Sequence, residues 1–119
     1  MIRAFLLYTG TDGNSHVKCG SVSPNALVQA QSILFKETPA NSALEWHVAP
    51  HTQFVITLAG TLEFDTRDGE TFTVHPGDVL IATDYTGSGH EWRLVDNNPW
   101  KRAYVVFEPG TDTHFVPEK

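Results

Sequence analysis

The sequence predicts a single all-β domain that folds as an antiparallel barrel or jelly roll. Apolar and polar residues alternate with a period of two along most of the chain. Turn-forming residues recur about every eight to twelve residues, which is the spacing of short strands in a sandwich or barrel. Almost no segment has the pattern of a helix that could connect parallel strands. A chain of 119 residues has the length of one domain.

Nine segments have the character of strands. The first is followed by a polar turn at residues 11–15, and the second ends at Thr38-Pro39. The third and fourth flank Ala49-Pro50, and the remaining five alternate with turns. In order, the expected strands are residues 5–8, 28–35, 44–48, 53–58, 61–66, 71–74, 79–82, 90–95 and 103–107.

The turns between these strands contain the residues that tight turns require. Gly60 permits a sharp bend after the fourth strand. Asp68-Gly69 predicts a hairpin turn. Pro76-Gly77 fits the two central positions of a type II turn, because proline fixes φ near −65° and glycine accepts a positive φ. A glycine loop at residues 87–89 precedes the eighth strand, and Asn97-Asn98-Pro99 precedes the ninth.

Composition excludes several classes of protein. The formal net charge of −6 and the lack of clustered Lys and Arg argue against nucleic-acid binding. The apolar run at residues 4–8 is too short for a signal peptide or a membrane span. Cys19 is the only cysteine, so no intramolecular disulfide can form. We therefore expect a soluble, cytoplasmic protein in which Cys19 is chemically inert.

Histidines lie at two places where a ligand pocket can form. His47 and His51 lie around the end of the third expected strand, and His90 begins the eighth. Imidazoles that meet from different strands can bind a small molecule, hold a metal ion or transfer protons. We expect a pocket near the barrel mouth, lined by His47, His51, Gln53 and His90.

Several motifs resemble those of the cupin superfamily. They are Gly60, Asp68-Gly69, Pro76-Gly77-Asp78-Val79 and His90. Further segments around residues 8–16, 46–53 and 84–90 resemble a group of small bacterial cupins, most of which have no assigned activity. The resemblance implies a double-stranded β-helix at about residues 28–108 of one domain (1–119), with the N-terminal strand and a C-terminal tail outside the barrel.

The resemblance also implies a place for a metal ion. Cupins typically use two histidines separated by one residue, then a glutamate, then a histidine of the second motif. His47 and His90 match the outer positions, whereas Ala49 and Gln53 replace the second histidine and the glutamate. His51 can replace the missing histidine if the strand stays regular through Pro50, because alternate residues of a strand face the same way. Such a set would suit Zn, Ni, Fe or Cu.

Other interpretations of the same residues stay open. Without a metal, His51 and His90 could act as a general acid–base pair, or the histidines could only form hydrogen bonds. Asp84 could orient His90 or cap its own turn. Trp46 and Trp92 could stack on a ligand, although core roles are commoner. We expect surface or edge positions for His16 and His75, and a tail position for His114.

The sequence thus predicts a small-molecule cupin of one of two kinds. One is a metal-assisted enzyme that acts on a polar or anionic organic molecule by proton transfer, elimination or oxygenation. The other is a non-catalytic binding or sensory protein. We also expect a homodimer, because both faces of residues 53–58 are apolar and need cover. Residues 4–8 could supply that cover by exchange between subunits or within their own chain.

Overall fold

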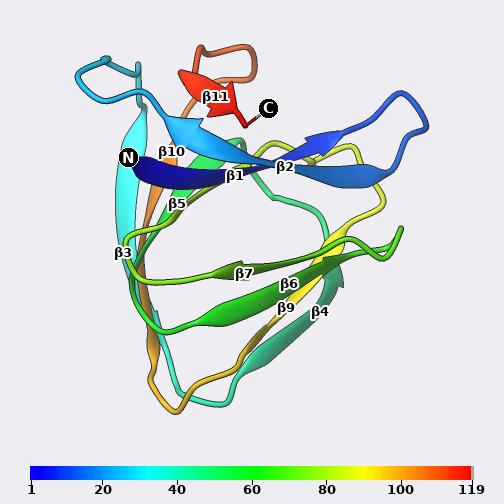
Figure 1. Ribbon diagram of the computed structural model, residues 1–119, viewed down its shortest axis with the longest axis vertical. Helices are drawn as coiled ribbons and strands as arrows, with labels where there is room; N and C mark the ends of the chain where they lie inside the picture. The colour runs from blue at the N-terminus through cyan, green and yellow to red at the C-terminus, as the bar shows by residue number, and fades with distance from the viewer. Residues whose placement is uncertain (119) are drawn as a thin grey trace.

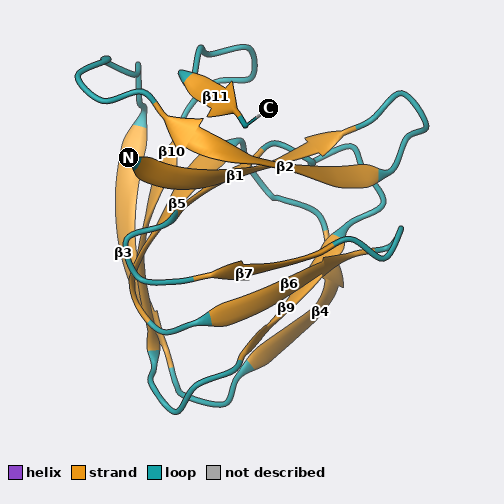
Figure 2. Ribbon diagram, in the orientation of Figure 1, coloured by secondary structure: helices purple, strands orange, loops and turns teal. Residues whose placement is uncertain are grey.

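The computed structural model describes residues 1–118, which contain eleven strands and no helix (Figure 2). An all-β jelly roll is therefore confirmed. No membrane-spanning helix occurs in this part of the chain. The strands are β1 (Ile2–Thr9), β2 (Ser15–Val22), β3 (Ser32–Thr38), β4 (Ala43–His47), β5 (Gln53–Ala59), β6 (Leu62–Thr66), β7 (Thr71–Val74), β8 (Val79–Ala82), β9 (His90–Leu94), β10 (Trp100–Val106) and β11 (Phe115–Pro117).

The strands form two sheets. The larger has seven strands in the order β11-β2-β1-β8-β5-β10-β3, and the smaller has four in the order β4-β9-β6-β7. In Figure 1, β1 and β2 cross the top of the view, β7, β6, β9 and β4 lie below them, and β3, β5 and β10 run along the left side. Only β1 and β8 pair in parallel within residues 1–118.

The expected turns are present. Asp68-Gly69 connects β6 to β7, and Gly69 has a φ of +85°. Gly77 has a φ of +92°, and the Asp78 amide donates to the His75 carbonyl oxygen at 3.0 Å, as in a type II turn. These residues fix the register of β6, β7 and β8 through local geometry.

The chain ends and the second expected strand differ from the prediction. The polar and glycine-containing segment of β2 is a strand because all eight of its residues pair with β1. Residues 28–31 are not a strand, and Val28 instead packs on the outside of the larger sheet. The expected tail contributes β11, which pairs with β2 at residues 20–22. Long-range pairing decides β2 and β11, so their local sequence did not reveal them.

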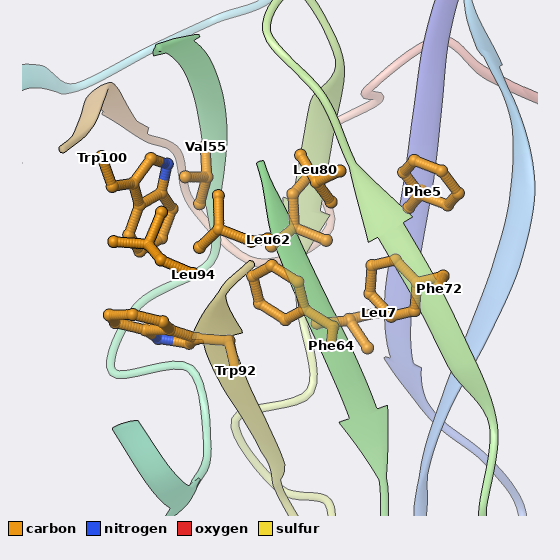
Figure 3. Packing of buried hydrophobic residues seen from close by; sticks show 11 residues of the cluster. Phe5, Leu7, Val55, Leu62, Phe64, Phe72, Leu80, Trp92, Leu94 and Trp100 are labelled. Atoms are coloured by element: carbon orange, nitrogen blue, oxygen red, sulfur yellow. The ribbon is translucent and has the colours of Figure 1, made fainter. Parts of the chain in front are cut away.

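Aromatic and aliphatic side chains fill the space between the sheets. Phe64 lies at the centre of this core, stacked on Phe72 with ring centroids 5.1 Å apart. Figure 3 shows Trp92 and Trp100 on one side of Phe64, and Phe72 and Phe5 on the other. The buried cluster comprises Phe5, Leu7, Val55, Leu62, Phe64, Phe72, Val74, Leu80, Trp92, Leu94 and Trp100.

The outer face of the larger sheet is covered mainly by the same chain. Phe54 packs there with Phe107, and Val28 and Phe115 add further cover. The N-terminal strand pairs with β8 of its own chain, which is one of the two alternatives that the sequence left open. The expectation that Leu58 is buried was wrong, since it is 56% exposed. Leu58 lies in a β-bulge, because Lys101 pairs with Ala59 and Arg102 with Thr57.

The edge strand β3 is the most exposed apolar strand of the described chain. It pairs only with β10, and Ile33 and Phe35 are 59% and 68% exposed. An edge strand of this kind has free backbone groups that can pair with another chain. The homodimer stays a prediction, and we expect it to form by antiparallel pairing of β3 with β3 of a second copy.

Sedimentation velocity at micromolar concentration tests this prediction. The parent protein should sediment as a dimer of 13.2 kDa chains, and Phe35→Lys should shift it to monomer because a buried lysine opposes pairing. Val116→Lys is the matched control, since Val116 is 49% exposed at the opposite edge of the same sheet. A monomeric parent, or a Phe35→Lys variant that stays dimeric, would contradict the prediction.

Candidate functional site

A cavity of about 740 Å³ lies between the two sheets on the side of the edge strands β3 and β4. His47, His51, Gln53 and His90 all line it. The structure therefore brings the four residues singled out in the sequence to one cavity. Their roles as metal ligands or catalytic groups remain predictions.

His47 and His90 are direct neighbours in this cavity. His47 ends β4, His90 begins β9, and the two residues pair across the strands with their ring centroids 4.4 Å apart. Gly89 makes the approach possible. It has a φ of +98°, and a Cβ there would lie 2.9 Å from the His47 carbonyl oxygen. Glycine is thus required next to His90 for both conformational and steric reasons.

His51 and Gln53 reach the cavity differently from the prediction. Residues 48–52 form a loop between β4 and β5, so the strand does not continue regularly through Pro50. The condition under which His51 would share the strand face of His47 is therefore not met, because proline removes the backbone donor that a regular strand needs. His51 is exposed and also borders a neighbouring cavity of about 330 Å³, whereas Gln53 is buried.

Hydrogen bonds fix the ring orientation of both neighbouring imidazoles. His47 Nδ1 lies 2.7 Å from the Glu45 carbonyl oxygen, and His90 Nδ1 lies 2.7 Å from Asp84 Oδ2. Because both partners accept hydrogen bonds at neutral pH, each Nδ1 carries a proton and donates it. In the neutral rings, Nε2 then keeps its lone pair. The pair can therefore offer two bases or two metal ligands.

Asp84 connects His90 to β2. Its Oδ2 accepts hydrogen bonds from His90 and from the Ser15 hydroxyl, each at 2.7 Å. Ser15 Oγ in turn accepts the Gly89 amide at 2.9 Å. Asp84 is fully buried, and its Oδ1 has no hydrogen-bond partner among residues 1–118. Of the two roles considered for Asp84, the structure thus shows that it orients His90.

The environment sets the charge of these groups. Burial acts to raise the pKa of Asp84, but the hydrogen bonds from His90 and Ser15 outweigh it, and the pKa lies below its ordinary value. Burial lowers the pKa of His47, and the neighbouring His90 lowers it further, against the effect of the Glu45 hydrogen bond. At neutral pH the site therefore holds an Asp84 carboxylate and a neutral His47.

A resident metal ion fits this site only in part. The two Nδ1-bonded imidazoles have the tautomer of metal-ligating histidines. However, His47, His51 and His90 do not bring three donor atoms within 4.8 Å of one another, and Gln53 offers only a neutral amide where a cupin glutamate would lie. Zinc centres need at least three protein ligands. The residues present therefore do not form a complete metal centre.

A histidine surrounded by carboxylates lies at the surface, where His16 of β2 meets the turns after β1 and β6. His16 Nδ1 lies 2.9 Å from Glu70, and its Nε2 lies 2.8 Å from Asp12 and 3.5 Å from Asp68. Asp12, His16 and Asp68 form the only group of three potential metal donors found within residues 1–118. The Asp12 and Glu70 hydrogen bonds raise the pKa of His16. Asp12 and Glu70 thus contact the two ring nitrogens of His16 and stabilise its protonated form.

The other tryptophans and histidines considered in the sequence take no part in the His47–His90 pair. Trp92 is buried and lines the cavity, whereas Trp46 is 37% exposed and lies under Arg67. His75 is exposed beside Arg3, in agreement with the expected surface position. His114 immediately precedes β11 and contacts the Leu27 carbonyl oxygen, so it does not lie in a free tail.

Sequence reasoning missed two residues of the site. Ser15 was assigned to a polar turn, and no sequence signal linked it to Asp84, 69 residues away. Arg102 lies in β10 and lines the cavity. The strand was expected to begin at Ala103, so the inward parity of Trp100, Arg102 and Tyr104 was not recognised. The alternation of those three residues would have been the signal.

Comparison with known proteins agrees with this architecture. The family model for the cupin domain matches residues 34–107, which is more than half of the chain, so this protein belongs to the cupin family. A crystal structure of an uncharacterized conserved protein with a double-stranded β-helix domain from Klebsiella pneumoniae is similar, with a TM-score of 0.51 and 23% sequence identity. The alignment covers 95% of this chain and 92% of that one. A search of curated proteins finds no match.

Proposed function

We propose that this cupin binds a small polar or anionic organic molecule in its cavity and promotes proton transfer on it. The observation that carries the proposal is the buried Ser15–Asp84–His90 chain, which leaves His90 Nε2 as a base beside His47. A carboxylate that accepts from Nδ1 holds the imidazole in one tautomer and stabilises it when it gains a proton.

The proton and the electron pair of this step are accounted for by His90, Asp84 and the substrate. His90 Nε2 removes a proton from a carbon next to a carbonyl group, and the electron pair of the broken C–H bond moves into the resulting enolate. Asp84 stabilises the imidazolium, which returns a proton to carbon. His47 stays neutral because its pKa is lowered, so it does not repel the imidazolium.

Two steps of measurement test this proposal. Binding of 7-oxooctanoate, whose ketone lies far along the chain from its carboxylate, and of its amide is measured first by calorimetry, with EDTA present. Compounds that bind are then incubated in D₂O, and deuterium at carbons 6 and 8, next to the ketone, is followed by NMR. We expect the parent protein to accelerate exchange and His90→Gln to lose about 100-fold or more of that rate, the usual range of general-base catalysis.

Two results would lead to other conclusions. Binding without accelerated exchange would support the alternative of a non-catalytic binding protein. Exchange that the His90→Gln variant retains would exclude His90 as the base. His75→Gln is the matched control, because His75 is exposed and lies outside the cavity lining.

A further inference from the structure

Arg102 is a buried cation without a carboxylate partner. It is 3% exposed, and no Asp or Glu forms an ion pair with it among residues 1–118. Removing a guanidinium from water is costly, so buried charges are normally paired. The missing counter-charge is a feature that the proton-transfer chemistry does not explain.

Hydrogen bonds from Nε and Nη1 hold the guanidinium of Arg102 in place and leave Nη2 available to a ligand. Its Nη1 donates to Thr38 Oγ1 at 2.6 Å and to the Trp100 carbonyl oxygen at 3.2 Å, and its Nε donates to Tyr104 Oη at 3.1 Å. The Trp100 ring lies 3.8 Å from the guanidinium carbon. No hydrogen-bond acceptor within the described chain reaches Nη2. A positioned guanidinium with free N–H groups is suited to a carboxylate.

The charge of the cavity lining supports an anionic occupant. Lys36 and Arg102 are its charged residues, and no Asp or Glu lines it, although the chain carries a net charge of −6. Acidic residues are thus excluded from the surface where they would compete for Arg102. Electrostatic complementarity of this kind selects anions over neutral molecules.

The rest of the lining limits the ligand's shape and polarity. Leu34, Val55 and Trp92 present apolar surface. Arg102 lies four residues along β10 from Val106, which pairs with Gln53. Four residues of a strand span about 13 Å. Arg102 therefore lies toward the other end of the cavity from Gln53, and a ligand that touches both ends is on the order of 10 Å long.

We infer that Arg102 binds the carboxylate of the ligand, so that the occupant of the cavity is a small organic acid with an apolar body. This inference rests on the proposed function, because it names the class of molecule whose other end lies at the imidazoles. Arg102 sets the specificity and takes no part in proton transfer. Trp100, Thr38 and Tyr104 position its guanidinium.

Matched acids and amides test the inference. Calorimetry compares octanoate, 3-phenylpropionate and 4-phenyl-2-oxobutanoate with their neutral amides. We expect the parent protein to bind at least one acid about 10- to 100-fold more tightly than its amide, as charge-assisted hydrogen bonds typically allow. Arg102→Met should abolish this preference, and Lys101→Met should retain it because Lys101 is exposed and lies outside the cavity lining.

A second variant keeps the test decisive if Arg102→Met does not fold. Arg102→Lys keeps the charge but cannot hold Thr38, Tyr104 and a carboxylate at once, so most of the preference should disappear. Equal affinities for acids and amides in the parent would overturn the inference and leave the proposed function intact. So would a preference that persists in the folded Arg102 variants. Failure of every compound to bind the parent would overturn both.

Discussion

Replacing Asp84 with alanine should lower the free energy of unfolding by about 2–5 kcal/mol. The change removes the acceptor of two buried donors, His90 Nδ1 and Ser15 Oγ. Each unsatisfied buried donor costs about 1–3 kcal/mol, and removal of a buried carboxylate offsets part of this loss. Urea denaturation at pH 7 measures the effect. A loss below about 0.5 kcal/mol, typical of surface substitutions, would contradict this account of the network.

Asp84→Asn removes the negative charge of Asp84 but keeps an acceptor for the hydrogen bonds from His90 and Ser15. Its amide oxygen can replace Oδ2 as the acceptor, while the amide nitrogen takes the place of the unpartnered Oδ1. The loss of stability at pH 7 should therefore be smaller than for Asp84→Ala.

The stability of the parent should also depend on pH through Asp84. The lowered pKa of Asp84 means that the folded state favours the carboxylate. The stabilisation is complete above the ordinary pKa of 3.8 and is lost as the pH falls through the lower folded value. The Asp84→Asn variant should lack this part of the acid dependence.

Replacing Phe64 with alanine should cost about 3–5 kcal/mol, the usual loss for a buried phenylalanine. Phe64 is 1% exposed and packs against Phe72 and Trp100 at the centre of the core (Figure 3). It also separates the packed side of the barrel from the cavity. The variant should thus be less stable in urea and have a larger cavity.

Leu34→Ala is the control for the Phe64 variant. Leu34 also lines the cavity but is 60% exposed on the edge strand β3. Its loss should change stability by no more than about 0.5 kcal/mol, as for most surface substitutions. Similar losses in both variants would contradict the position of the core between the sheets.

The predictable part of the fold is the part that local chemistry determines. Alternating apolar residues predicted β5 to β9 closely, and the Asp68-Gly69 and Pro76-Gly77 turns fixed the connections between them. The strands β2 and β11 could not be predicted in this way, because their residues have weak local preference and are held by pairing with β1 and with each other. The bulge at Leu58 likewise results from pairing with β10.

The site was predictable to a similar degree. His47 and His90 could be identified because their motifs resemble those of cupins, and the structure places them in contact. Two roles for Asp84, orienting His90 or capping its own turn, stayed open, since the sequence alone does not show where a carboxylate points. Arg102 was missed because the strand was expected to begin at Ala103, whereas β10 begins at Trp100 and holds Arg102 inside between Trp100 and Tyr104.

Membership of the cupin family establishes the fold and leaves the chemistry to the individual cavity. In this chain the usual metal ligands are incomplete, whereas a histidine hydrogen-bonded to a buried carboxylate is present, together with a buried guanidinium that has no ion-pair partner among residues 1–118. These features favour a metal-independent site for an organic acid. The surface cluster at Asp12, His16 and Asp68 is a separate feature that lies outside this cavity.

NMR titration of the parent protein with 4-phenyl-2-oxobutanoate tests the central claim most directly, because side-chain signals of histidine and arginine report both ends of the cavity. We predict that the signals of His47, His90 and Arg102 shift together with one dissociation constant, while those of His16 and His75 stay unchanged. Shifts confined to His16 or other surface groups, or no shift at His90 and Arg102, would contradict the account.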